Sequence, residues 1–257
     1  MEFSRRVFGA HVPSADPLGE AEARGADAVQ IFLSNPKSWA KPLERADAEE
    51  LKKSSVPIFV HSPYLINLVS DNPKVRIPSR KILQETCVAA DAIGAEGVVV
   101  HGGQMVETTD FDEGVERWRK ALEGVEATTR VLVENTAGGK NPIARTIEGI
   151  ERLWAEIGEF GPGFVFDTCH AWAAGIPLDE FVGRVMEITG QIDLVHFNDS
   201  RDPFDSRRDR HANLGEGMIP EDQLRYVIDH VDAPMILETP GGVEAHRTDL
   251  EWMRQKA

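Results

Sequence analysis

The sequence has little cysteine, with only Cys87 and Cys169 among 257 residues. Two cysteines cannot build the disulfide framework of a small secreted domain, which agrees with a reducing compartment. No apolar run approaches the roughly 18 residues that a membrane span needs, and the opening string MEFSRRVFGAH has no signal-peptide stretch. These absences exclude a disulfide scaffold and predict a cytosolic protein.

Positive charge is also scarce, because 28 Lys and Arg residues stand against 43 Asp and Glu residues, a net charge of −15. This balance argues against a chain that coats nucleic acid with its whole surface. A local cationic site remains compatible with it, because bound divalent ions add charge that a residue count misses. Linkers, repeats and low-complexity tracts are missing too, so the length predicts a single domain spanning residues 1–257.

Short apolar runs rich in Val, Ile and Phe alternate with segments of helical period. The runs are continuous rather than alternating, which is typical of strands buried on both faces. Eight strands are expected at 7–10, 28–32, 57–60, 97–100, 131–133, 163–166, 192–195 and 234–237. Helices are expected at 15–24, 44–53, 78–93, 111–127, 143–157, 178–189, 220–231 and 246–255. Eight such pairs favour an α/β fold, a single-domain (β/α)8 TIM barrel, over an open doubly wound sheet.

Imidazoles and carboxylates occur where seven of the eight apolar runs stop; only the second run, VQIF, lacks one. The strand-end residues are His11, His61, His101, Glu134, Asp167, His196 and Glu238. His170 follows three residues after Asp167, and the polar loop FDSRRDRHANLGEG supplies Asp209 and His211. In a barrel the active site is assembled from the carboxyl ends of the strands, so these side chains are expected to converge.

A single strand-end histidine usually reflects ordinary hydrogen bonding, and Asp167 taken alone is better explained as a helix cap. That explanation fails for the whole set, because burying so many ionisable groups at one barrel mouth is unfavourable without compensation. Imidazole and carboxylate ligands without thiolate suit zinc, manganese or iron, and nine ligands, leaving His11 aside, are too many for one ion. Cys169 is interpreted as a packing residue. The pattern therefore predicts two or three clustered ions, which favour displacement at a phosphodiester.

Seven strings carry a resemblance to a known family. HSPYLINL, VVVHGG, VLVENTAG, FDTCHAWAAG, VHFNDS, DRHANLGEG and ILETP, in this order, closely resemble endonuclease IV, the zinc-dependent apurinic/apyrimidinic (AP) endonucleases of base excision repair. The resemblance covers essentially the whole chain, from GAHVP to LETP. It implies a hydrolase that cleaves the phosphodiester 5′ to an abasic site in duplex DNA, leaving a 3′-hydroxyl and a 5′-deoxyribose phosphate. It also implies a monomer of the bacterial cytosol and nucleoid.

The same resemblance implies three zinc ions, with manganese an alternative at one site. His61 and His101 match the ligands of the first ion, and Glu134 matches the carboxylate that bridges the first and second ions. The resemblance also implies that Glu134 lies next to the attacking hydroxide, so Glu134 is the candidate catalytic residue. The other ligands of the second ion match Asp167, His196 and Glu238. His170, Asp209 and His211 match the set that holds the third.

Members of this family flip the abasic nucleotide out of the duplex, which is cheapest where a base is already missing. Tyr64 and Leu65 match inserting positions of the loop after the third strand. Lys37 stands where the family pattern has an Arg, and since lysine loses the planar stacking surface, a phosphate contact is favoured over a wedge. Arg208 and Arg210 flank the predicted ligand Asp209 and are expected to contact phosphates. The loop HVPSADPLGE departs from the family's Gly-rich turn and must take another shape.

Two other classes of function remain open from the residues. A sugar isomerase or epimerase of the xylose-isomerase-like kind shares the barrel and a carboxylate-rich metal site, and VENTAG, FDTCH and LET would suit it. Such enzymes need fewer histidines and no Asp-x-His pair, so Asp209 and His211 argue against that class. The second of these alternatives is a barrel that stores metal or binds damaged DNA without cutting it. No ligand position is lost, and this favours the enzyme.

Overall fold

The computed structural model describes residues 6–108 and 110–257. Eight parallel strands close into a barrel in the order β1-β10-β7-β6-β5-β4-β3-β2. They are β1 (Phe8–His11), β2 (Val29–Ile31), β3 (Ile58–His61), β4 (Gly97–His101), β5 (Arg130–Glu134), β6 (Gly163–Asp167), β7 (Leu194–His196) and β10 (Met235–Leu237). The predicted (β/α)8 barrel is confirmed, and each predicted strand lies within a few residues of an observed one.

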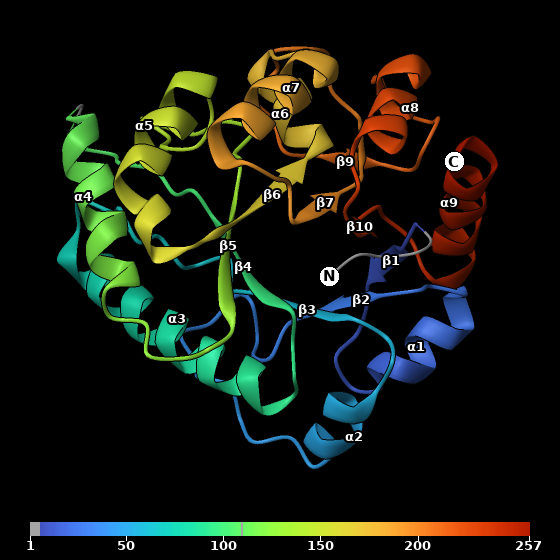
Figure 1. Ribbon diagram of the computed structural model, residues 1–257, viewed down its shortest axis with the longest axis horizontal. Helices are drawn as coiled ribbons and strands as arrows, with labels where there is room; N and C mark the ends of the chain where they lie inside the picture. The colour runs from blue at the N-terminus through green and yellow to red at the C-terminus, as the bar shows by residue number, and fades with distance from the viewer. Residues whose placement is uncertain (1–5, 109) are drawn as a thin grey trace.

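Helices form an outer ring around the strands (Figure 1). They are α1 (Pro17–Arg24), α2 (Ala48–Lys53), α3 (Pro73–Ala92), α4 (Phe111–Leu122), α5 (Ile147–Ile157), α6 (Thr168–Ala174), α7 (Leu178–Thr189), α8 (Glu221–His230) and α9 (Val243–Lys256), with a 3-10 turn η1 (Gly158–Phe160) after α5. Among the described residues, no helix is long and apolar enough to cross a membrane.

Two helix predictions were wrong by five residues at one end, and one helix was not predicted. The third helix begins at Pro73 rather than Pro78, because the side chain of Asn72 accepts a hydrogen bond from the amide of Lys74 and caps it there. The fourth helix ends at Leu122, short of the predicted residue 127. Helix α6 was not predicted, because all seven of its residues are buried and it therefore has no amphipathic period to detect.

The barrel interior is filled by one layer of apolar side chains, and the predicted ligands lie directly above it. That layer consists of Ala28, Phe59, Val99, Leu132, Val165, Leu194 and Ile236. Side chains two positions apart on a strand point to the same face. Val99 points into the barrel, so His101, two positions further along the strand, points inward as well. The same relationship holds for Leu132 with Glu134 and for Leu194 with His196. The strand register pairs His101 with Glu134, which fixes their heights in the barrel mouth.

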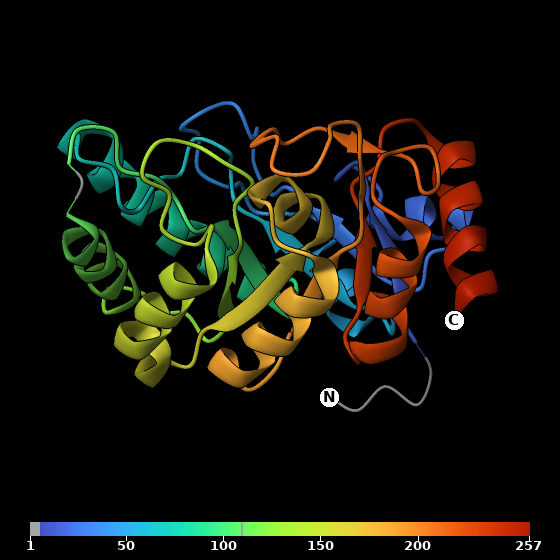
Figure 2. The same ribbon diagram turned by 90° about the horizontal axis from the view of Figure 1, so that it is seen from above.

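A small antiparallel hairpin, β8 (Asp199–Ser200) with β9 (His211–Ala212), rises beyond the end of β7. In Figure 2 it lies at the upper edge of the molecule, the side toward which the arrow of β6 points. Asp199 is buried and accepts hydrogen bonds from the backbone amides of Gly215, Gly217 and Ile219. A Cβ atom on Gly217 would lie 2.3 Å from Oδ1 of Asp199, so this loop requires glycine there. The hairpin thus holds His211 over the mouth.

Candidate metal centre

All nine predicted metal ligands meet at the carboxyl-terminal mouth of the barrel. Five of them are the last residues of their strands, namely His61, His101, Glu134, Asp167 and His196. Glu238 follows β10, His170 lies in the first turn of α6, and Asp209 and His211 come from the β8–β9 hairpin. A parallel barrel brings the ends of distant strands together, so residues spread over most of the chain share one site.

The ligand atoms form overlapping groups. Those of His61, His101 and Glu134 lie within 4.8 Å of one another, and Glu134 is shared with a second group that has the same spacing. The members of the second group are Glu134, Asp167, His196 and Glu238. A carboxylate shared between two groups has the position expected of a ligand that bridges two ions.

The third group is assembled around Asp209. Its Oδ2 lies 3.1 Å from Nε2 of His170, and its Oδ1 lies 3.1 Å from Nε2 of His211. Nε2 of His211 also lies 3.7 Å from Oδ2 of Asp167, which links this group to the second one. The structure thus brings together the side chains for which the sequence predicted a third ion.

Four of these histidines have one ring nitrogen engaged by a fixed hydrogen-bond partner. Nδ1 of His61 lies 2.7 Å from the carbonyl of Ser62, Nδ1 of His170 lies 2.8 Å from that of Asn135, and Nδ1 of His211 lies 3.2 Å from that of Glu238. A carbonyl only accepts, so each Nδ1 donates its hydrogen, and each Nε2 is the nitrogen left to bind a metal ion in place of a proton. In His196 the roles of the two ring nitrogens are exchanged, because Nε2 is the one held, at 2.8 Å from Oε1 of the Gln30 amide.

Buried polar atoms of the cluster lack hydrogen-bond partners within the described part of the chain. They are Oε2 of Glu134, Nε2 of His170 and Nε2 of His211. Leaving such atoms unpaired in the interior costs about 1–3 kcal/mol each. A divalent cation would satisfy all three, and histidines whose second nitrogen is anchored by a carbonyl are the usual form of metal ligand. The side chains present therefore fit metal ions.

The electrostatics of the cluster are dominated by its carboxylates. Burial by itself lowers the pKa of His196, but Glu238 and Glu134 outweigh burial and raise that pKa to about 9. Burial by itself raises the pKa of Glu134, yet His101 and His196 hold it well below its usual range. Burial raises the pKa of Asp167, whereas Glu134 stays ionised and stabilises positive charge on His196. A buried carboxylate of this kind also favours the binding of a divalent cation.

Asp167 both caps a helix and lies within the cluster. Its Oδ1 accepts from the backbone amide of His170 at 2.6 Å and so begins α6, which agrees with the capping interpretation. Its Oδ2 accepts from the side-chain amide of Asn198 at 2.8 Å and lies on the side of His211. Capping and membership of the metal group are therefore compatible, because each uses its own oxygen.

Three buried amides behind the ligands were missed by the sequence interpretation. Asn135 bonds the backbone of Asp167 through both its oxygen and its nitrogen, and Oδ1 of Asn198 accepts from the amide of Glu238. Gln30, in the one strand whose end bears no imidazole or carboxylate, contacts His196 and Glu238. The available signal was their position, since Asn135 and Asn198 lie within two residues of a ligand and Gln30 is the one polar residue inside the apolar run VQIF.

Cys169 lies near the third group but is a poor candidate ligand. Its sulfur lies within 4.8 Å of ligand atoms of Asp209 and His211. Burial first, and then the charge of Asp167, raise its pKa to about 12. A metal binds the thiolate rather than the thiol, so the structure agrees with a packing role for this residue.

The predicted DNA-contacting residues Lys37, Tyr64 and Leu65 lie on two neighbouring loops at the mouth. The amide of Tyr64 donates to the carbonyl of Pro36 at 3.1 Å, which ties these loops together. The ring of Tyr64 is 52% exposed and stacks with the ring of His101, with centroids 6.3 Å apart. Burial, followed by the charge of Glu238, raises the pKa of Tyr64 to about 12, so its phenol stays neutral.

Arg208 and Arg210 point toward solvent but share one carboxylate. Nε of Arg210 donates to Asp202 Oδ2 at 2.6 Å, and NH1 of Arg208 lies 3.5 Å from Asp202 Oδ1. Both arginine side chains are more than half exposed. Arg210 is therefore held over the mouth, where it lines an opening together with Arg201.

Two further basic residues, Arg76 and Arg80 of α3, form hydrogen bonds within the protein. Arg76 donates to the carbonyls of Ser70 and Asp71, and Arg80 donates to the carbonyl of Arg117. These bonds hold α3 against the loop that precedes it and against α4. Their first role is therefore structural.

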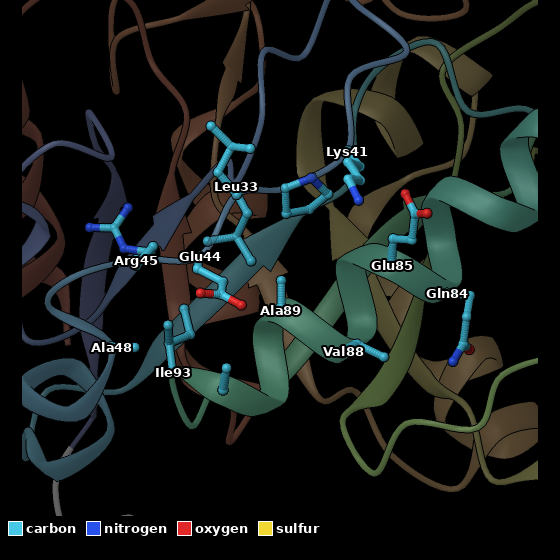
Figure 3. A pocket seen from close by; sticks show the side chains of 13 residues that line it. Leu33, Lys41, Glu44, Arg45, Ala48, Gln84, Glu85, Val88, Ala89 and Ile93 are labelled. Atoms are coloured by element: carbon cyan, nitrogen blue, oxygen red, sulfur yellow. The ribbon is translucent and has the colours of Figure 1, made fainter.

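The mouth opens into a hollow of about 600 Å³ whose walls include His61, His101, Glu238 and Arg210. A neighbouring groove of about 330 Å³ runs past Tyr64, Gln104 and Gly138. A further hollow of about 360 Å³, shown in Figure 3, lies between the 33–48 segment and the outer face of α3. Leu33, Pro42 and Val88 line this last one, which includes none of the predicted ligands, so the reaction site is the mouth.

The sequence and the fold of this chain are both similar to those of known proteins. The model of the family described as "Xylose isomerase-like TIM barrel" matches residues 18–256. A protein of Mycobacterium ulcerans (strain Agy99) named "Probable endonuclease 4" is 54% identical over 250 residues, which are 97% of this chain and 98% of the relative. The crystal structure of endonuclease IV from Thermus thermophilus is 32% identical, with a TM-score of 0.84 over 97% of this chain and 98% of that one.

The barrel itself is shared more widely. The crystal structure of a D-tagatose 3-epimerase-like protein superposes with a TM-score of 0.79 over 97% of this chain and 96% of that one, at 20% identity. Similarity at that level of identity concerns the fold alone, because one barrel hosts many chemistries.

Proposed function

The chain belongs to the endonuclease IV family of xylose isomerase-like TIM barrels, and on that basis we propose that it is a metal-dependent AP endonuclease. The resemblance of its motifs to that family is thereby confirmed. The proposed reaction is hydrolysis of the phosphodiester 5′ to an abasic site in duplex DNA, with a 3′-hydroxyl and a 5′-deoxyribose phosphate as products. We further propose that residues 1–257 act as one domain, as a monomer, on the DNA of a bacterial cytosol.

The observation that carries the proposal is the convergence of nine imidazole and carboxylate side chains without a thiolate. Four of the nine are carboxylates, namely Glu134, Asp167, Asp209 and Glu238. We propose zinc as the metal and three ions as the count, since nine ligands give about three to each ion. Catalytic zinc sites usually have three protein ligands and keep a position open for water or substrate.

In the proposed assignment, His61 and His101 bind the first ion and Glu134 is shared with the second. Asp167, His196 and Glu238 complete the second set, and His170, Asp209 and His211 hold the third. Bound ions of this kind supply hydroxide near neutral pH and stabilise the oxygens of an in-line displacement. Glu134 lies at the centre of the cluster, so its carboxylate is the group best placed to orient the nucleophile.

Groups around the mouth supply the contacts that a nucleic acid needs. Arg210 lines the hollow above the cluster, and Arg208 shares Asp202 with it. Lys37 is exposed on the loop that Tyr64 holds through its backbone. We propose that Lys37, Arg208 and Arg210 contact phosphates, whereas Tyr64 and Leu65 enter the space left by the missing base. A duplex that lacks a base is the easiest to open in this way.

Two measurements test this function. Protein purified without any chelator should contain close to three equivalents of zinc by elemental analysis. It should also nick a duplex with one tetrahydrofuran abasic analogue and leave the same duplex without the lesion intact. A single manganese, with interconversion of ketose and aldose and no nicking, would replace this proposal by the sugar isomerase.

A further inference from the structure

Gln30 occupies an unusual place among the groups behind the metal cluster. It is fully buried as the middle residue of β2, beside His11 in the strand register. Two strands, β1 and β10, separate β2 from β7 in the barrel, yet the side chain of Gln30 reaches His196 on β7. It therefore crosses the barrel interior beneath the cluster.

The amide of Gln30 makes three contacts, and their chemistry fixes its orientation. Its Nε2 lies 2.6 Å from Oε1 of Glu238 and 3.0 Å from Nδ1 of His11, while its Oε1 lies 2.8 Å from Nε2 of His196. A carboxylate accepts and cannot donate, so the nitrogen of the amide must face Glu238. The oxygen then faces His196, whose Nε2 must carry the hydrogen.

This hydrogen bond decides which atom of His196 is left for a ligand. With Nε2 held by Gln30, Nδ1 is the nitrogen left to bind a metal ion in place of a proton, and it lies 3.1 Å from Oε1 of Glu134 and 3.4 Å from Oε2 of Glu238. The same amide holds Oε1 of Glu238 away, so Oε2 is the oxygen turned to the cluster. Two ligand atoms of the second group are thus oriented by one side chain.

The other anchored histidines of the cluster do not depend on a side chain in this way. His61, His170 and His211 donate to backbone carbonyls, which no substitution removes. His196 donates to an amide that a mutation can delete. Of the four anchored histidines, His196 is therefore the one whose orientation rests on a replaceable side chain.

We propose that Gln30 is a positioning residue, which fixes the tautomer of His196 and the orientation of Glu238 and so sets the metal affinity of the second group. The inference rests on the proposed metal-dependent function. Partners that orient metal ligands typically change metal affinity or activity by about 10- to 100-fold when they are removed. Gln30→Met keeps the length of the side chain and removes both its donor and its acceptor.

The test compares zinc retention in wild type, Gln30→Met and the control Gln223→Met. Gln223 accepts a hydrogen bond from the amide of Leu178 and lines neither hollow at the mouth, and so controls for the loss of an amide. Each zinc-loaded protein is dialysed against a graded series of nitrilotriacetate and its zinc is counted. One equivalent should leave Gln30→Met at a chelator concentration about 10- to 100-fold lower than in the other two proteins. Identical retention in all three would overturn the proposal.

Turnover supplies a second readout. In Gln30→Met, kcat at low free zinc should fall by a similar factor and recover in excess zinc, while KM for the abasic duplex stays unchanged. A raised KM with normal kcat would instead make Gln30 a substrate-binding residue and contradict the positioning role. If wild type binds zinc but does not incise the duplex, the proposed function fails, while the retention comparison still decides the role of Gln30.

A measurement on the wild-type protein covers the case in which Gln30→Met does not fold. In zinc-loaded protein with ¹⁵N-labelled histidine, NMR should find the ring hydrogen of His196 on Nε2, in slow exchange with solvent. Finding that hydrogen on Nδ1 would contradict the proposal without the use of any variant.

Discussion

The carboxylate of Asp209 lies 3.1 Å from Nε2 of His170, although the two residues belong to a loop and to a helix that follow different strands. The other carboxylate oxygen of Asp209 lies 3.1 Å from Nε2 of His211. Asp209 is thus one of the residues that link α6 to the β8–β9 hairpin, and the one that does so through two histidines. An Asp-x-His pair in a charged loop is ambiguous alone, but here it completes a third group of ligand atoms.

Asp209→Ala should remove one of the three metal equivalents and lower kcat by at least about 100-fold, beyond the typical loss for residues that merely support a ligand. Zinc analysis and incision kinetics measure both effects. Asp205→Asn is the matched control, because Asp205 is an exposed acid of the same loop whose charge pairs with Arg145 and Arg207. Full zinc content in Asp209→Ala would remove Asp209 from the ligand set.

Glu134→Ala should abolish incision while the barrel stays folded. Glu134 is shared by two ligand groups, so its loss disturbs both, whereas the apolar layer beneath it is untouched. Incision of the abasic duplex and far-UV circular dichroism are the two measurements, with Glu216→Ala on the exposed side of the hairpin loop as the control. Retained cleavage by a folded Glu134→Ala protein would show that the bridging role is misassigned.

Lys37→Ala should weaken DNA binding modestly and reduce the salt dependence of the binding constant. One lost phosphate contact lowers the slope of log K against log salt by about 0.9. Binding isotherms at several salt concentrations measure this slope, and Lys53→Ala, on the exposed surface of α2, should leave it unchanged. An unchanged slope in Lys37→Ala would favour the wedge role.

Asp71 gives a prediction for acid stability. Burial by itself raises the pKa of Asp71, but hydrogen bonds from the amide of Glu107, from Arg117 and from the amide of Val106 lower it to about 2. Since the folded pKa lies below the unfolded value, the ionised carboxylate stabilises the protein above about pH 4, and this contribution is lost as pH falls toward about 2.

Thermal melts of wild type and Asp71→Asn should therefore differ most near neutral pH, with the wild type more stable. The gap should close as pH falls from about 4 to about 2. A gap that is constant across that range would mean that the charge of Asp71 contributes nothing to stability.

Much of the fold and of the site could be predicted from the sequence, because the barrel repeats one local pattern. Each strand is a short apolar run, and six of the nine ligands stand where such a run ends, as VVVH ends at His101. Because the strands of the barrel are parallel, their carboxyl ends all meet at one mouth, which brings these ligands together. The amphipathic period of α4 and α5 located those helices for the same local reason.

What could not be predicted depends on contacts between distant segments. Helix α6 is buried on every side, so no period marks it. The pairing of Arg210 with Asp202 requires the shape of the hairpin, which neither residue encodes alone. The role of Gln30 is not predictable, because an amide inside an apolar run suggests no ligand and only the folded barrel brings it to His196.

The central claim is that the mouth cluster cuts DNA at abasic sites through bound metal. The most direct measurement uses a duplex with one tetrahydrofuran residue, labelled on the damaged strand, and protein that is first stripped of metal and then reloaded with zinc. The account predicts no cleavage by stripped protein and, after reloading, one nick immediately 5′ to the lesion with a 3′-hydroxyl that a polymerase extends. Cleavage that survives complete metal removal, or none after zinc is restored to three equivalents, would contradict it.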